Sequence, residues 1–214
     1  MTLARRPRRS AGFTLIELLV VLAILGVLLT LGLPALERFI NRSKMEAMTR
    51  QTASLMQLAR LESIKRGAPA RVVADYTAHE VYAFTDANTA DGPIYDAAND
   101  HLIARYPLPK GVFFWAAQDA GPEGANALVT CSGCPPGGWA EFKTDGSAVE
   151  ATGGSAIEPG GAVRFGDERG NFLEVRIVTP ATGRVELGKW DPTTSPTTLE
   201  YYPSGENGKV WQWY

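Results

Sequence analysis

The chain has 214 residues, which is enough for one globular domain and an additional extended element. Its formal net charge is −2, but Arg5, Arg6, Arg8 and Arg9 all lie within residues 1–12, which contain no acidic residue. Residues 13–214 therefore hold 17 of the 21 basic and all 23 acidic side chains, a net charge of −6, so the chain is a poor general partner for nucleic acid.

Residues 14–33 form an apolar run in which Glu17 is the only charged residue. Twenty residues of helix rise about 30 Å, the thickness of the hydrocarbon core of a bilayer. Because four arginines precede the run, the positive-inside rule predicts a cytoplasmic N-terminus and an exported remainder. A cleaved secretory signal peptide is disfavoured, since no Ala-x-Ala site closes the run. A plain signal anchor is the alternative.

Glu17 argues against a plain anchor. A carboxylate within a spanning helix costs on the order of 3 kcal/mol, so it usually has a partner. If the chain is cut after Gly12, the α-amino group of Phe13 lies one turn before Glu17 and neutralises it, in the same chain or in a neighbour. The alternative is that Glu17 lies near the membrane surface and reaches water.

The string of residues 12–17, Gly-Phe-Thr-Leu-Ile-Glu, follows the basic leader and opens the apolar run. This arrangement resembles the class III leader junction of type IV pilins and pseudopilins. The resemblance implies that a prepilin peptidase cuts between Gly12 and Phe13 on the cytoplasmic side and N-methylates Phe13. It also implies that Glu17 is the carboxylate used in assembly, and that the apolar segment is retained as membrane anchor and filament core.

Pro34 interrupts the apolar run and is expected to end or kink the helix. Residues 35–66 contain no Gly and no further Pro, and their helical pattern stops before Gly67 and Pro69. One apolar face recurs at three- and four-residue spacing: Met45, Met48, Thr52, Leu55, Leu58 and Ala59. We expect this methionine-rich face to pack on the chain's own domain, with a binding groove as the alternative.

After Gly67 the pattern changes to short β-type runs separated by Gly-, Pro- and Asp-rich loops. The best candidate strands are residues 71–73, 80–84, 102–106, 112–115, 162–165, 172–178 and 184–187. No strand–helix–strand spacing occurs, so antiparallel pairing is expected. The predicted fold class is α+β, a long transmembrane-plus-amphipathic N-terminal helix packed on an antiparallel β-sheet domain, as in pilins.

Three further strings narrow the resemblance. They are residues 59–67 at the predicted helix end, residues 142–147 around Asp145-Gly146, and residues 175–185 around Thr182-Gly183. Together they resemble H-type minor pseudopilins and their pilus relatives, the GspH/FimT group, over about residues 10–187. The local alternative is that Asp-Gly and Thr-Gly are turn and hairpin signals.

The predicted organisation has five parts. They are a basic leader that is removed (1–12), a transmembrane part of the helix (13–34), its amphipathic part (35–66), a periplasmic β domain (67–188) and an aromatic C-terminal extension (189–214). In the extension, residues 199–203 and 211–214 concentrate aromatic side chains. We favour an extra edge strand there over a partner-binding tail.

Cys131 and Cys134 form a C-x-x-C pair in a loop-like stretch on the side of the membrane where disulfides persist. A redox site with this spacing opens a helix in a strand–helix–strand unit, which the pattern lacks. A metal site lacks further ligands. We therefore predict a local disulfide between Cys131 and Cys134.

Catalytic signatures are absent from the sequence, including G-x-S-x-G, H-E-x-x-H, the P-loop and the dinucleotide-binding fingerprint. His79 and His101 are expected on the surface. Asp96, Asn99 and Asp100 lack the spacing of an EF-hand, although calcium in this acidic loop stays open. We expect no catalytic residue, no cofactor and no metal site, so a membrane-anchored enzyme is the least favoured function.

The expected function is structural: a minor pseudopilin of a type II secretion system. The chain would be a single-pass protein of the bacterial inner membrane whose C-terminal domain joins a periplasmic pseudopilus that supports protein export across the outer membrane. Expected partners are the prepilin peptidase, other pseudopilins or pilins and the inner membrane, with secreted cargo or the outer-membrane channel as further candidates.

The alternative is a minor, FimT-like type IV pilin in pilus assembly or DNA uptake. For the DNA-binding branch the resemblance implies a Gly-Arg-x-Arg ending. Here Gly183-Arg184-Val185-Glu186 places an acid at the second basic position, so DNA is disfavoured as a partner.

Overall fold

The computed structural model of the chain describes the backbone of residues 14–87, 94–114, 137–149, 161–166, 172–190 and 199–202. It describes their side chains as well, except at residues 31–35, 137, 172, 189–190 and 199–202. The chain divides into two compact units, Met1–Ile40 and Asn41–Tyr214.

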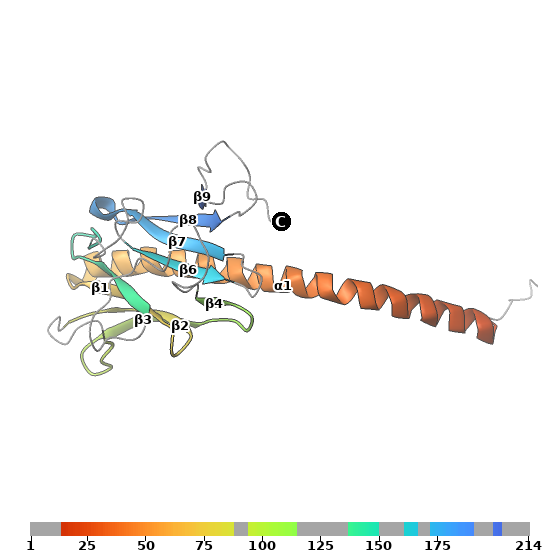
Figure 1. Cartoon of the computed structure of the whole chain (residues 1–214). Helices are drawn as coiled ribbons and strands as arrows, with labels where there is room; N and C mark the ends of the chain where they lie inside the picture. Colours follow the sequence, from red (N-terminus) through yellow and green to blue (C-terminus); the bar gives the residue numbers. More distant parts are fainter. Residues whose placement is uncertain are drawn as a thin grey trace, which may run out of the picture. The chain divides into compact units, whose positions relative to one another are not determined.

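One helix, α1 (Leu15–Arg66), continues through both units (Figure 1). It begins behind Thr14, whose Oγ1 accepts a hydrogen bond of 3.2 Å from the backbone N–H of Glu17, as an N-cap side chain does. Pro34 does not end the helix, because a proline removes only one backbone donor and a long helix tolerates that loss. The predicted stop is confirmed: α1 ends at Arg66, and Gly67 takes a φ of +62°.

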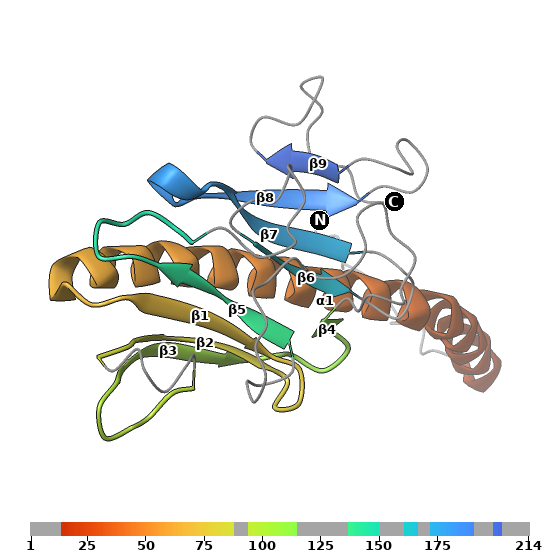
Figure 2. The same ribbon diagram turned by 60° about the vertical axis from the view of Figure 1, so that its left-hand side comes forward.

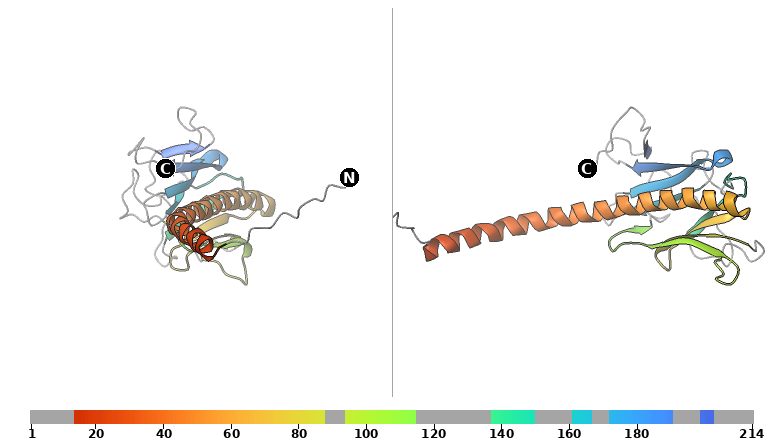
Figure 3. Two further views of the ribbon diagram at one scale, coloured as in Figure 1. Left: turned by 90° about the vertical axis from the view of Figure 1, so that its right-hand side faces the viewer. Right: turned by 180° about the vertical axis from the view of Figure 1, so that it is seen from behind.

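In unit Asn41–Tyr214 the strands form two sheets, and every described pairing is antiparallel. The four-stranded sheet has the order β3 (His101–Pro107), β2 (Glu80–Thr85), β1 (Ala70–Asp75) and β5 (Gly137–Phe142). The five-stranded sheet has the order β4 (Phe113–Phe114), β6 (Ala162–Gly166), β7 (Phe172–Thr179), β8 (Arg184–Trp190) and β9 (Leu199–Tyr202). Both sheets lie along the same part of α1 (Figures 2 and 3).

The predicted α+β class, a long N-terminal helix packed on antiparallel strands, is confirmed, with two sheets in place of one. A strand is present at each of the seven predicted positions. The edge strand favoured for the C-terminal extension is β9, which pairs with β8, whereas residues 211–214 lie outside the described residues. Strand β5 was missed: Gly137 and Gly138 look like loop residues, and only pairing with β1 holds them in a sheet.

The core of this unit lies between α1 and the two sheets. Met45, Met48 and Leu55 of the helix are buried against Val72 of β1 and Val163 of β6. The methionine-rich face is therefore core, and the binding-groove alternative is wrong. Leu58, predicted on this face, is 42% exposed, and Met56, not predicted, is fully buried. At 100° per residue, Leu58 lies about 120° from the mean direction of the buried helix residues and Met56 about 40°.

Candidate processing and assembly sites

Glu17 lies exposed in the first turn of α1, while the predicted cleavage residues Gly12 and Phe13 lie outside the described residues. Every described side chain between residues 14 and 40 is exposed, including those of Leu18, Leu22 and Leu25. The described apolar side chains of residues 14–40 thus have no cover from the rest of the described chain.

No helix in the described part of the chain is both long enough and apolar enough to cross a membrane. Of the predicted transmembrane part, 13–34, residue 13 and the side chains of 31–35 lie outside the described residues. The span stays a prediction.

At the other end of α1, side chains of the last helical residues contact the backbone of the loop formed by residues 143–147. The Nε–H of Arg60 donates a hydrogen bond of 3.0 Å to the carbonyl oxygen of Gly146. The hydroxyl of Ser63, which is fully buried, lies 3.0 Å from the carbonyl oxygen of Lys143 and 2.8 Å from that of Arg60, and its single proton is shared between them. Side chains of the helix thus contact two carbonyl groups of a segment that follows some eighty residues later.

The corner between β7 and β8 contacts the same turn and the same end of α1. This corner holds the short helix η2 (Pro180–Thr182) and Gly183, whose φ is +60°. A Cβ atom at Gly183 would lie 2.7 Å from the carbonyl oxygen of Gly146 and 2.9 Å from Cδ of Arg60. The backbone N–H of Ala148 also donates a bond of 2.6 Å to the carbonyl oxygen of Pro180. We call this meeting of helix end, turn and corner the junction.

The junction unites the three strings on which the narrower sequence resemblance rests. Each string alone looks like a helix end or a turn, and the turn predictions are confirmed by φ values of +81° at Gly146 and +60° at Gly183. Sequence reasoning did not bring them together, because their mutual contacts are made by backbone carbonyls, which carry no sequence signal. The sequence offered one signal for this contact. Each of the two turns holds a glycine, and the end of the predicted helix holds two hydrogen-bond donors, Arg60 and Ser63.

Charges around the junction are largely matched locally. Hydrogen bonds from Lys65 and Arg66, each 2.8 Å, lower the pKa of the Glu62 carboxyl group. Hydrogen bonds from the side chain and backbone of Ser147 lower the pKa of Asp145. Both carboxylates are therefore stabilised in their charged form by neighbours in the same turn.

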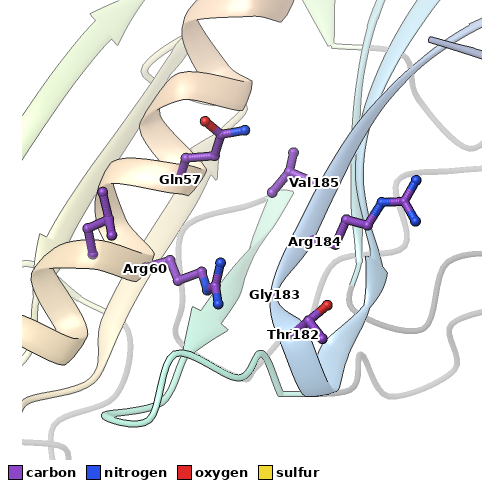
Figure 4. A pocket seen from close by; sticks show the side chains of 7 residues that line it. Gln57, Arg60, Thr182, Gly183, Arg184 and Val185 are labelled. Atoms are coloured by element: carbon purple, nitrogen blue, oxygen red, sulfur yellow. The ribbon is translucent and has the colours of Figure 1, made fainter. Parts of the chain in front are cut away.

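An open groove of about 410 Å³ lies beside the junction, between α1 and the β7–β8 corner (Figure 4). Its lining consists of Gln57, Arg60, Leu61, Thr182, Gly183, Arg184 and Val185. Gln57 and Arg60 extend from the helix toward the corner, while the Arg184 side chain points away from the helix. Arg184 pairs with Glu186, whereas Arg60 uses only its Nε–H within the described part of the chain.

The remaining predicted site residues do not form a centre. His79 and His101 are exposed, as expected. Asp96 accepts bonds from the Ala98 N–H and from Asn99, and Asp100 accepts one from the Asp96 N–H. No group of three or more His, Cys, Asp or Glu side chains suited to a metal ion occurs among the described residues. Cys131 and Cys134 lie outside them, so their disulfide stays a prediction.

Comparison with known proteins addresses the N-terminal segment directly. Residues 7–33 match the model of the prokaryotic N-terminal methylation motif. The chain carries this motif at its N-terminal end. It is 51% identical over 57 residues to the pilin-like protein PilA1 of Thermus thermophilus, a match that covers 27% of this chain and 35% of that protein. The match therefore spans about a third of the length of this curated relative.

Two solved structures of the minor pseudopilin EpsH, from the type 2 secretion system of Vibrio cholerae, also match the chain. One is 14% identical with a TM-score of 0.43 and covers 67% of this chain and 95% of the other. The second is 13% identical with a TM-score of 0.44 and covers 68% and 93%, respectively.

Proposed function

We propose that this pilin-like chain is a membrane-anchored structural subunit of a periplasmic pseudopilus that supports protein export by a type II secretion system. The observation that carries the proposal is the N-terminal methylation motif at residues 7–33, followed by a helix whose described apolar side chains are all exposed up to residue 40. The proposal includes no catalytic activity and no cofactor. Its partners are the prepilin peptidase, other pilin-like subunits and the inner membrane.

The geometry around Glu17 supports a role in assembly. Thr14 caps α1, so the helix begins at Leu15, two residues after Phe13, the proposed mature N-terminus. Glu17 is exposed in the first turn, and the structure shows no ion pair for it within the described residues. Once the leader is removed, the positive α-amino group of a neighbouring subunit neutralises this carboxylate and offsets its cost in the bilayer.

Intact-mass measurement of the membrane-purified protein tests the proposal. We expect the mass of residues 13–214 plus one methyl group, and retention of the leader in a Gly12→Val variant, because the proposed cut lies at this glycine. A mature N-terminus beyond residue 30 would be the result of signal-peptide cleavage and would contradict the pilin-type processing.

A minor type IV pilin is the second candidate, and the similarity to a pilin-like protein of Thermus favours it. DNA binding by this candidate is disfavoured further, since Glu186 of β8 pairs with Arg184 of the same strand and with Arg176 of β7, and so offsets the basic charge of both arginines. Deleting the gene separates the two candidates: loss of protein export supports the pseudopilus, and loss of surface pili with normal export supports the pilus.

A further inference from the structure

The groove beside the junction presents a cation next to two apolar side chains, those of Leu61 and Val185. Arg60 lines it with a guanidinium whose Nε–H is bonded to Gly146, while no acceptor among the described residues takes its Nη groups. Gln57 lies one turn earlier, and Leu61 and Val185 provide apolar contact. Leu58 and Leu61 are 42% and 60% exposed, although both lie on a helix whose opposite face is core. This combination suits a carboxylate flanked by apolar side chains.

The same chain carries a patch of that composition. In residues 36–40, Leu36, Phe39 and Ile40 are exposed, Phe39 by 68%. Glu37 lies among them, next to the exposed Arg38, and makes no ion pair or hydrogen bond with any described residue. An exposed phenylalanine beside two exposed aliphatic residues marks a surface that another chain covers.

We propose that the groove binds residues 36–40 of a second copy of this chain, with Glu37 of one copy paired to Arg60 of the other. The apolar side chains around Glu37 then cover Leu58 and Leu61. In a filament the contact is head-to-tail: each copy offers its groove to one neighbour and its residues 36–40 to another, and the series stays open where the rotation between copies does not close a ring. This inference rests on the proposed role as a filament subunit, and it names one contact within the filament.

The charges support the pairing. Residues 13–214 carry a net charge of −6, so two copies repel each other unless opposite charges meet at the contact. In the groove, Arg184 is already matched by Glu186, which leaves Arg60 as the lining cation without a carboxylate among the described residues. Partial burial of Arg60 strengthens the attraction relative to that between two fully exposed charges.

Co-purification of two differently tagged full-length copies from detergent-solubilised membranes tests the contact. A Gln57→Glu variant places a carboxylate in the groove and is expected to lower the co-purified fraction about tenfold. The matched control is Gln51→Glu, which adds the same charge to an exposed position of α1 outside the groove lining and should leave the fraction unchanged. Adding Glu37→Lys to Gln57→Glu should restore association.

Equal effects of Gln51→Glu and Gln57→Glu, no rescue by Glu37→Lys, or wild-type copies that do not co-purify would each overturn the contact. Retention of a different pilin-like subunit in place of the second copy would overturn it as well. Failure of the proposed function can be told apart from failure of this contact, because it would appear as an uncleaved leader in the intact-mass measurement. Unchanged thermal unfolding of both glutamate variants, expected for exposed positions, excludes misfolding as the cause.

Discussion

Gly183 lies with its Cα hydrogen against the carbonyl oxygen of Gly146 and Cδ of Arg60, at a φ of +60°. A Gly183→Ala change therefore adds a steric clash to the backbone strain of the left-handed conformation. We expect it to lower the free energy of unfolding by about 3 kcal/mol, measured by chemical denaturation of the full chain in detergent.

The matched control is Gly67→Ala. Gly67 has nearly the same φ, +62°, but no atom lies within 4 Å of the position of an added Cβ. The Gly67→Ala change should therefore lower the free energy of unfolding only by the backbone strain, about 1 kcal/mol. Equal losses at both glycines would mean that the junction does not hold the helix end, the turn and the corner together.

Glu17 contributes through its charge rather than through packing, because its side chain is exposed in the first turn of α1. We expect Glu17→Ala and Glu17→Gln to insert in the membrane normally and to enter filaments about tenfold less than the wild type. Fractionation of membranes and sheared filaments measures both quantities. If both variants assemble as well as the wild type, Glu17 merely reaches the membrane surface.

At the scale of the element, the second half of α1 buries one face against the sheets and leaves the other exposed. Met56 is fully buried in the core, while Leu58, two positions later, is 42% exposed. We expect Met56→Ala to lower the free energy of unfolding by about 3 kcal/mol and Leu58→Ala to change it by at most about 0.5 kcal/mol. Thermal unfolding of the two variants gives the comparison, and a larger loss at Leu58 would contradict the packing described above.

Strands β5 and β9 show two different limits of sequence reasoning. Residues 199–202 have the aromatic content of a strand, so the edge strand could be predicted, and β9 pairs with β8. Residues 137–142 begin with two glycines, and β5 exists because its backbone pairs with all six residues of β1. Main-chain pairing of that kind depends on the partner strand and leaves no local pattern.

At the scale of the whole molecule, the predicted orientation places Cys131 and Cys134 on the oxidising side of the membrane. We expect no thiol labelling of denatured protein before reduction and two labelled thiols after it. Because the loop between the cysteines is short, the disulfide should contribute less than the roughly 3 kcal/mol of a 15-residue loop. Two free thiols before reduction would contradict both the disulfide and the orientation.

The sequence by itself determined the features that depend on composition and short spacing. These are the methylation motif at residues 7–33, the long helix with its stop at Gly67, and the positions of seven strands. Each arises from local physics: apolar periodicity, capping and turn residues act over a few neighbours along the chain.

Only the tertiary structure decided what those elements do together. It placed Arg60 and Ser63 against carbonyl oxygens of Gly146 and Lys143, and it brought Gly183 onto the same point. It also left Leu61 exposed beside a groove while Met56 became core. The physical reason is that backbone carbonyls are identical in every residue and that burial depends on which surfaces meet. Both are properties of the assembled sheets and helix, which no short stretch of sequence contains.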